Sequence, residues 1–163
     1  MIPLLFALAA QAPDSARQAH FTRVLHQAND SLDRVRGAAA GFRTDLSISS
    51  SALVLQRAAR VHGSCRGADA ALVEVESLLA GGVYRRTAQR EQAQLQASSA
   101  ELRHALARCQ REWAVPSGPT VAQADSLRAW GPYRTAQLDA ALRRYTGSVQ
   151  EFMQRAGLKT TGR

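Results

Sequence analysis

The sequence is poor in cysteine, lysine and aromatic residues, and each shortage excludes a class of protein. Among 163 residues there are two cysteines, Cys65 and Cys109, one lysine, Lys159, and 6% aromatic residues. The two cysteines are too far apart for the Cys-x-x-Cys-His sequence of a c-type haem or for a Cys-x-x-Cys redox pair. No long run of Val, Ile and Tyr favours a sheet, and beyond the first residues no segment approaches the ~20 apolar residues of a membrane span. We therefore expect an all-α protein without a transmembrane span in its processed form.

The residues that are abundant, namely Ala, Leu, Gln and Arg, favour helix. A chain of this length, with 45% hydrophobic and 21% charged residues, fits one globular domain. Its 21 basic and 13 acidic residues give a formal charge of +8. Such a charge favours anionic partners, such as acidic lipid headgroups, envelope polysaccharide or nucleic acid.

Two stretches carry side chains at the alternating spacing of four and three residues that marks one face of a long helix. We call such a row a seam. The two seams are Val54, Ala58, Val61, Cys65, Ala68, Leu72, Val75 and Leu79, and then Ala88, Gln92, Leu95, Ser99, Leu102, Leu106, Cys109 and Trp113. Each cysteine lies in one seam, so the sequence predicts two helices that place their cysteines in a shared core.

Two further seams lie before and after this pair. They are Phe21, Leu25, Ala28, Leu32, Val35, Ala39 and Phe42, and then Leu138, Leu142, Tyr145, Val149, Phe152 and Ala156. Apolar residues beside the seams, such as Val24, Leu53 and Leu55, make each face wider than a two-stranded coiled coil uses. The sequence therefore predicts an antiparallel four-helix bundle with up-down-up-down connections. An extended hairpin that forms a homodimer is the alternative, because it would show the same period.

Breaks between the seams set the expected helix limits. Pro116-Ser-Gly-Pro119 is the clearest loop, and Gly131-Pro132 predicts a kink or a break in the fourth helix. We expect one bundle domain over residues 13–157 and a frayed basic tail over residues 158–163. The first expected helix runs from near Asp14 or Ser15, where Ser15 and Gln18 form a capping box, to about Gly41, and the second runs from a cap within 47–51 to Leu79 or Ala80. The third runs from Tyr84 or Thr87 to Ala114. The fourth runs from a second capping box, Thr120 with Gln123, to about Ala156.

Residues 1–12 are predicted to be a cleaved export signal. Their apolar stretch, residues 2–10, is long enough for the core of such a signal, although no basic residue precedes it. Cleavage after Ala9, Ala10 or Ala12 would give a periplasmic or secreted protein. The alternative is an apolar amino terminus on a cytosolic helix.

An exported protein meets an oxidising compartment, so Cys65 and Cys109 are predicted to form a disulfide, with buried free thiols as the alternative. The spacing raises a difficulty for this bond. A turn at Gly81-Gly82 followed by a helix from Tyr84 would place Cys65 opposite a residue near position 100, too far from Cys109. The bond therefore requires the stretch 81–90 to be mostly loop, or the third helix to overhang the bundle.

Gly63 and Gly67 lie on either side of Cys65 within a predicted helix, where each costs ~1 kcal/mol relative to alanine. Two features of the structure could offset that cost. In the first, which we favour, the backbone of a neighbouring helix approaches them closely. In the second, a local opening exposes Cys65 for redox chemistry.

The sequence lacks the complete motifs that metal and haem sites require. Glu101 and His104 form the one Glu-x-x-His motif, whereas a bundle di-metal site needs two, and both are predicted to face solvent. His62, one turn from Cys65, is half of a metal site at most. We assign no catalytic, cofactor-binding or metal-binding residue.

The sequence thus favours an exported, non-enzymatic bundle that binds other molecules through its surface. Its size, charge, signal and hairpins are similar to those of small bacterial envelope proteins such as the Spy-type periplasmic chaperones, whose Leu-Thr-x-x-Gln motif is absent here. The arginines, Arg103 among them, are expected to form a solvated face. A metal- or haem-binding bundle is the first alternative, and a cytosolic protein associated with nucleic acid is the second.

Overall fold

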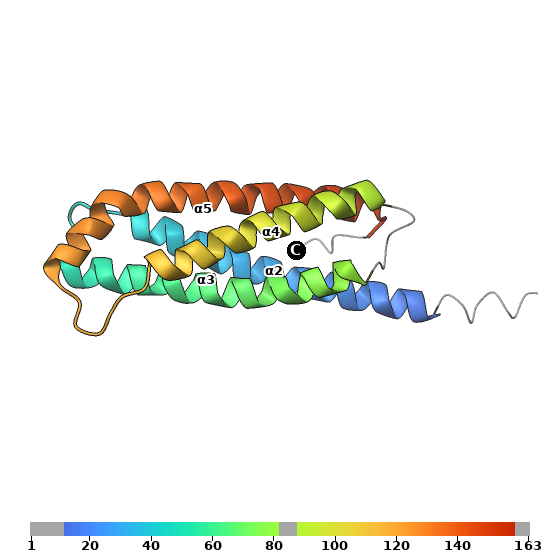
Figure 1. The fold of residues 1–163 in the computed structure, drawn as a ribbon, viewed down its shortest axis with the longest axis horizontal. Coiled ribbons are helices and arrows are strands. Elements are labelled where there is room, and N and C mark those ends of the chain that lie inside the picture. The colour runs from blue at the N-terminus through green and yellow to red at the C-terminus, as the bar shows by residue number, and fades with distance from the viewer. Residues whose placement is uncertain (1–11, 82–87, 159–163) are drawn as a thin grey trace, which may run out of the picture.

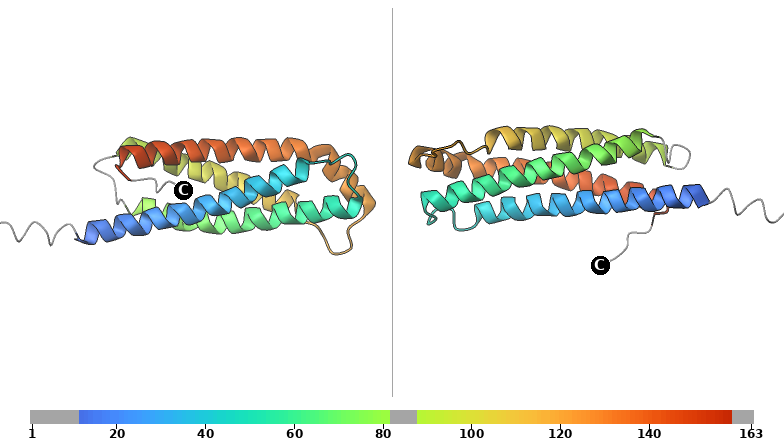
Figure 2. Two further views of the ribbon diagram at one scale, coloured as in Figure 1. Left: turned by 180° about the vertical axis from the view of Figure 1, so that it is seen from behind. Right: turned by 90° about the horizontal axis from the view of Figure 1, so that it is seen from below.

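The computed structural model describes residues 12–81 and 88–158, which form four long helices and no strand (Figure 1). They are α2 (Ala12–Arg43), α3 (Ser51–Ala80), α4 (Gln89–Glu112) and α5 (Val121–Arg155). Successive helices run in opposite directions, as the views from behind and below also show (Figure 2). The predicted antiparallel four-helix bundle is confirmed.

α3 packs against all three other described helices, α2, α4 and α5. α5 in turn packs against α2, α3 and α4. Small buried residues in the seam of α3, namely Ala58, Cys65 and Ala68, help to explain how two helices on opposite corners of the bundle can touch. α3 and α5 are therefore the helices that organise the core.

The core consists of the predicted seams. Every member of the first three seams is buried, as are five of the six members of the fourth, with Ala156 half-buried. Burial of a large apolar side chain contributes roughly 1.5–3 kcal/mol, so these rows supply most of the energy that holds the helices together. The largest fully buried side chains include Phe21, Phe42, Trp113 and Tyr145.

Two helix starts can be compared with expectation. α2 begins at Ala12, so the predicted start at Asp14 or Ser15 is wrong. Proline is compatible with the first turn of a helix, where its missing N–H has no partner to lose, and Pro13 therefore does not delay the start. The Thr120 capping box is confirmed, because Thr120 Oγ1 accepts from the backbone N–H of Gln123 and the Gln123 side chain accepts from the backbone N–H of Thr120.

α5 continues through Gly131 and Pro132 as one helix. The proline removes one backbone donor, and Thr135 Oγ1 donates to the carbonyl oxygen of Pro132 at 2.9 Å. The kink expected here stays a prediction. Within the described ranges, no helix combines the length and hydropathy that crossing a bilayer requires.

Candidate functional site

A disulfide joins Cys65 of α3 to Cys109 of α4 inside the bundle. The two Cα atoms are 6.3 Å apart, and the side chains are 0% and 4% exposed. α3 ends at Ala80 and α4 begins at Gln89, which moves the centre of the hairpin toward the midpoint of the two cysteines. The expected starts of this helix, Tyr84 and Thr87, lie outside the described residues. The later start of α4 thus reduces the mismatch in register that seemed to oppose the bond.

The disulfide also occupies the sulfur atoms that a metal site would need. His62 is half-buried, and its Nδ1 donates to the carbonyl oxygen of Gln110 at 2.9 Å. Glu101 and His104 are both exposed, and Glu101 forms a 2.7 Å ion pair with Arg144 of α5. No group of three or more His, Cys, Asp and Glu side chains in the described part of the chain is placed to hold a metal ion.

Gly63 and Gly67 do not mark a close helix contact, and the interpretation favoured from the sequence is wrong. Both are exposed, and a Cβ built on either would meet no described atom within 4 Å apart from its own helix. They lie on the outer surface of α3 while Cys65 points into the core. The spacing itself carried this information, because residues two positions before and after a buried residue lie on the opposite side of the helix.

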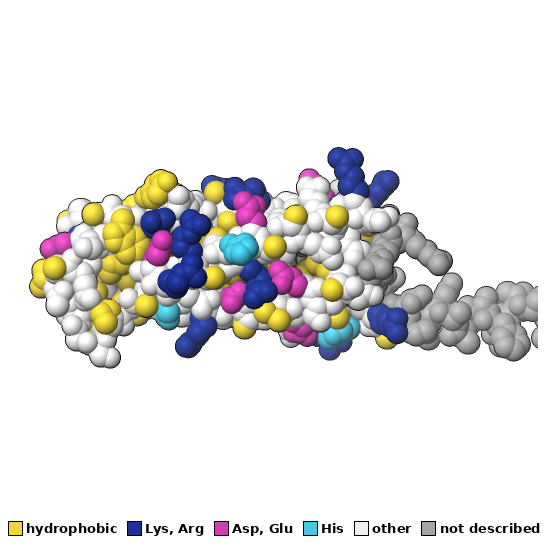
Figure 3. All heavy atoms as spheres, in the orientation of Figure 1, with side chains coloured by type: hydrophobic (Ala, Val, Ile, Leu, Met, Phe, Trp, Pro, Cys, Tyr) yellow, Lys and Arg dark blue, Asp and Glu magenta, His cyan; other side chains and the backbone are white. Residues whose placement is uncertain are grey.

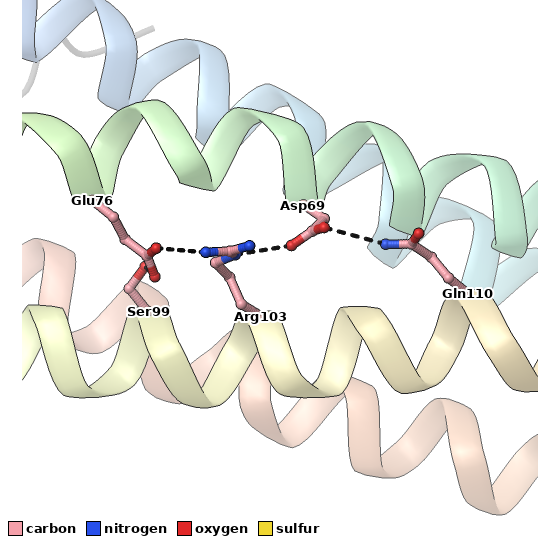
Figure 4. Close-up of polar contacts among 5 residues, drawn as sticks. All are labelled: Asp69, Glu76, Ser99, Arg103 and Gln110. Carbon is pink, nitrogen blue, oxygen red and sulfur yellow. Dashed lines mark hydrogen bonds and ion pairs between the residues drawn. The ribbon is translucent and has the colours of Figure 1, made fainter.

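Arg103 is the centre of a polar network between α3 and α4 (Figure 4). Its Nε donates to Asp69 at 3.0 Å and its Nη1 donates to Glu76 at 2.8 Å. Ser99 Oγ donates to the same Glu76 at 3.1 Å, and the Gln110 amide lies 3.5 Å from Asp69. Asp69 and Glu76 are two helical turns apart on one face of α3, so a single guanidinium that binds both fixes the register of α4 against α3.

This network differs from the solvated arginine face that we expected. The Arg103 side chain is 39% exposed and its two carboxylates are 27% and 28% exposed. The hydrogen bonds to Asp69 and then to Glu76 raise the pKa of the Arg103 guanidinium, so it stays charged. At this exposure the ion pairs contribute at most about 1 kcal/mol each, and their main effect is on alignment. The seven-residue spacing of the two carboxylates was the available signal in the sequence.

A groove of about 370 Å³ lies between α4 and α5. Ala105, Leu138 and Ala141 contribute to its apolar part, and Cys109 borders it. At its edges Glu112 forms an ion pair with Arg134 at 3.5 Å, and Glu101 forms one with Arg144 at 2.7 Å. The carboxylates are thus engaged in holding the two helices together.

A second groove, of about 260 Å³, is more apolar and lies where the α4–α5 connection meets α3. Leu55 of α3 lines it, together with the connection residues Val115 and Pro116. Trp130 of α5 also lines it and packs edge-to-face on Trp113, with ring centroids 5.1 Å apart. In the sequence, the signal for this groove is the absence of charged residues from 113–124.

Tyr145 of α5 brings a hydroxyl group into the core. Its side chain is 0% exposed, and its Oη has no hydrogen-bond partner among the described residues. Burial, reinforced by the negative charge of Glu76, raises the pKa of the Tyr145 phenol. An unsatisfied buried hydroxyl is unfavourable, so this residue is a local cost within an otherwise apolar seam.

Tyr145→Phe is therefore expected to raise the free energy of unfolding by about 1 kcal/mol at neutral pH. Above pH ~10 the unfolded phenol ionises while the folded one stays neutral, so the wild-type protein should lose about 1.4 kcal/mol per pH unit that the variant keeps. Denaturant titrations from pH 7 to 11 measure both effects. Tyr133→Phe, at a residue that is 65% exposed, is the matched control, and equal behaviour of the two variants would contradict the prediction.

The fold and the buried bond define the class: a disulfide-linked, all-α four-helix bundle. No protein-family model, curated protein or solved structure matches this chain. Its function is therefore argued from its own residues.

Proposed function

We propose that this protein is exported to the periplasm or secreted, and that it acts there without catalysis, as a structural or chaperone-like bundle that binds other molecules through its surface. The disulfide between Cys65 and Cys109 is the observation that carries this proposal. Such bonds persist in oxidising compartments and are rare in the cytosol. The predicted signal over residues 1–12 supports the same location.

The arrangement of charge supports binding over catalysis. Asp69 and Glu76 are held by Arg103, and Glu112 is held by Arg134. Carboxylates bound in this way align helices and are poorly suited to proton transfer. The formal charge of +8 favours anionic envelope components as partners, with another protein as the alternative.

Intact mass of the protein from its native host tests the proposal. We expect the loss of the first nine to twelve residues, and two thiols that react with an alkylating agent only after reduction. A full-length chain with two free thiols would contradict export, and would favour the cytosolic, nucleic-acid-associated alternative. Bound metal or colour in the same sample would favour the metal- or haem-binding alternative.

A further inference from the structure

Two uncharged stretches of the chain lie at one end of the bundle. Residues 46–56 of the α2–α3 connection and early α3, and residues 113–124 of the α4–α5 connection and early α5, contain no Asp, Glu, Lys or Arg. Figure 1 shows the two connections at the same end of the molecule, opposite the start of α2. We call these two stretches the loop end. In a chain with 21% charged residues, two such stretches meeting at one place make an uncharged surface.

Large apolar side chains project from both connections of the loop end. Ile48 is 82% exposed and Val121 is 65% exposed. The apolar groove lined by Val115, Pro116 and Trp130 belongs to the same end. Figure 3 shows hydrophobic side chains gathered toward this end, while charged side chains occupy the middle of the same face.

Arginines follow directly behind the uncharged tip. Arg57 donates to the carbonyl oxygen of Thr44 and Arg128 donates to that of Ser49, so two guanidinium groups support the α2–α3 connection from which Ile48 projects. Arg43 and Arg111 are exposed and make no ion pair within the described ranges.

The acidic residues nearby offset only part of this charge. Asp125 is paired with Arg128 at 2.5 Å, and Glu112 is paired with Arg134. Asp45 is exposed beside Leu46. An apolar tip backed by positive charge is the arrangement that anionic lipid surfaces attract, because apolar groups enter the headgroup region while cations remain at the phosphates.

We propose that the loop end docks on the surface of an anionic lipid bilayer, with Ile48 and Val121 entering the headgroup region. This inference rests on the proposed function and names its partner. The two residues project from separate connections at one end, so a flat surface can meet both at once. A second copy docked end to end would bring the arginines of two molecules together, and a peptide in the groove near Trp130 would leave Ile48 uncovered.

Sedimentation with vesicles tests this docking, using the protein as purified from its native host and, in the same processed form, its variants. The vesicles are phosphatidylcholine with and without phosphatidylglycerol. We expect binding to the anionic vesicles, weakened by salt, and a loss of at least about tenfold in the Ile48→Asp/Val121→Asp double variant. Both sites are exposed, and an acidic residue is favourable in the first turn of α5, so the variant should fold.

Val73→Asp is the matched control, because Val73 is 49% exposed on α3 away from the loop end. Val73→Asp adds one negative charge away from the loop end, so it should weaken vesicle binding by less than about twofold. Equal losses in the control and the double variant, equal binding to neutral vesicles, or no binding at all would overturn the proposal. The docking proposal would also be overturned if the protein bound an unfolded protein but did not bind the vesicles. Because processing and thiol state are measured separately, failure here is distinguishable from failure of the proposed export.

Discussion

Replacing Cys65 and Cys109 together with alanine is expected to lower the free energy of unfolding by about 4 kcal/mol. The bond connects residues that are 44 positions apart, and breaking it returns to the unfolded chain the conformational freedom of that long loop. Both side chains are buried between α3 and α4, so the loss of their packing adds to the effect. Urea titration of the oxidised wild-type protein and the double variant measures the difference.

Reduction provides the control for this prediction. A reducing agent should destabilise the wild-type protein by a similar amount and should leave the double variant unchanged, because the variant has no bond to break. Helix content in the absence of denaturant should be the same in both, since the seams that form the core remain. A wild-type protein that is insensitive to reduction would show that the bond contributes nothing to stability.

Gly131→Ala is expected to cost about 2 to 3 kcal/mol, although alanine normally favours helix. A Cβ at this position would lie 2.5 Å and 2.8 Å from two ring carbons of Phe42, and 3.2 Å from Trp113. Phe42 is fully buried and packs edge-to-face on Trp113, with centroids 4.6 Å apart, so the ring has little room to move. Thermal or urea unfolding of the variant measures the cost.

Gly63→Ala is the matched control, with the opposite expected sign. Nothing described lies within 4 Å of its Cβ position, so the substitution should stabilise the protein by roughly 1 kcal/mol. Phe42→Leu should recover part of the loss in the Gly131→Ala background, because a smaller side chain leaves space for the methyl group. If Gly131→Ala and Gly63→Ala change stability in the same direction, the close contact at Gly131 is absent.

The fold could be predicted because it depends on the spacing of apolar residues within each helix. The alternation of four and three residues placed Val54 to Leu79 and Ala88 to Trp113 in the core, and the structure buries all of these seam positions. The capping box at Thr120 is equally local, since its two partners are three residues apart. A local pattern is sufficient where the interaction itself is local.

Features that depend on residues far apart in the sequence could not be predicted in the same way. The sequence predicts Gly131 only as a helix breaker beside Pro132, whereas a Cβ at this position would meet Phe42 and Trp113 from other parts of the chain. Gly63 was expected to have such contacts and has none within the described residues. Arg103 was assigned to solvent because its two carboxylate partners belong to another helix. A single sequence does not show which of several similar positions lie opposite one another.

The covalent bond divides the bundle into two kinds of helix. α3 and α4 are linked through Cys65 and Cys109, whereas no disulfide joins α2 or α5 to this cross-linked pair in the described residues, and both pack against it through side chains. In an oxidising environment the unfolded chain therefore keeps these two segments joined, whereas the segments of α2 and α5 can move away from them. Refolding of the oxidised chain then begins with the two cysteines already paired.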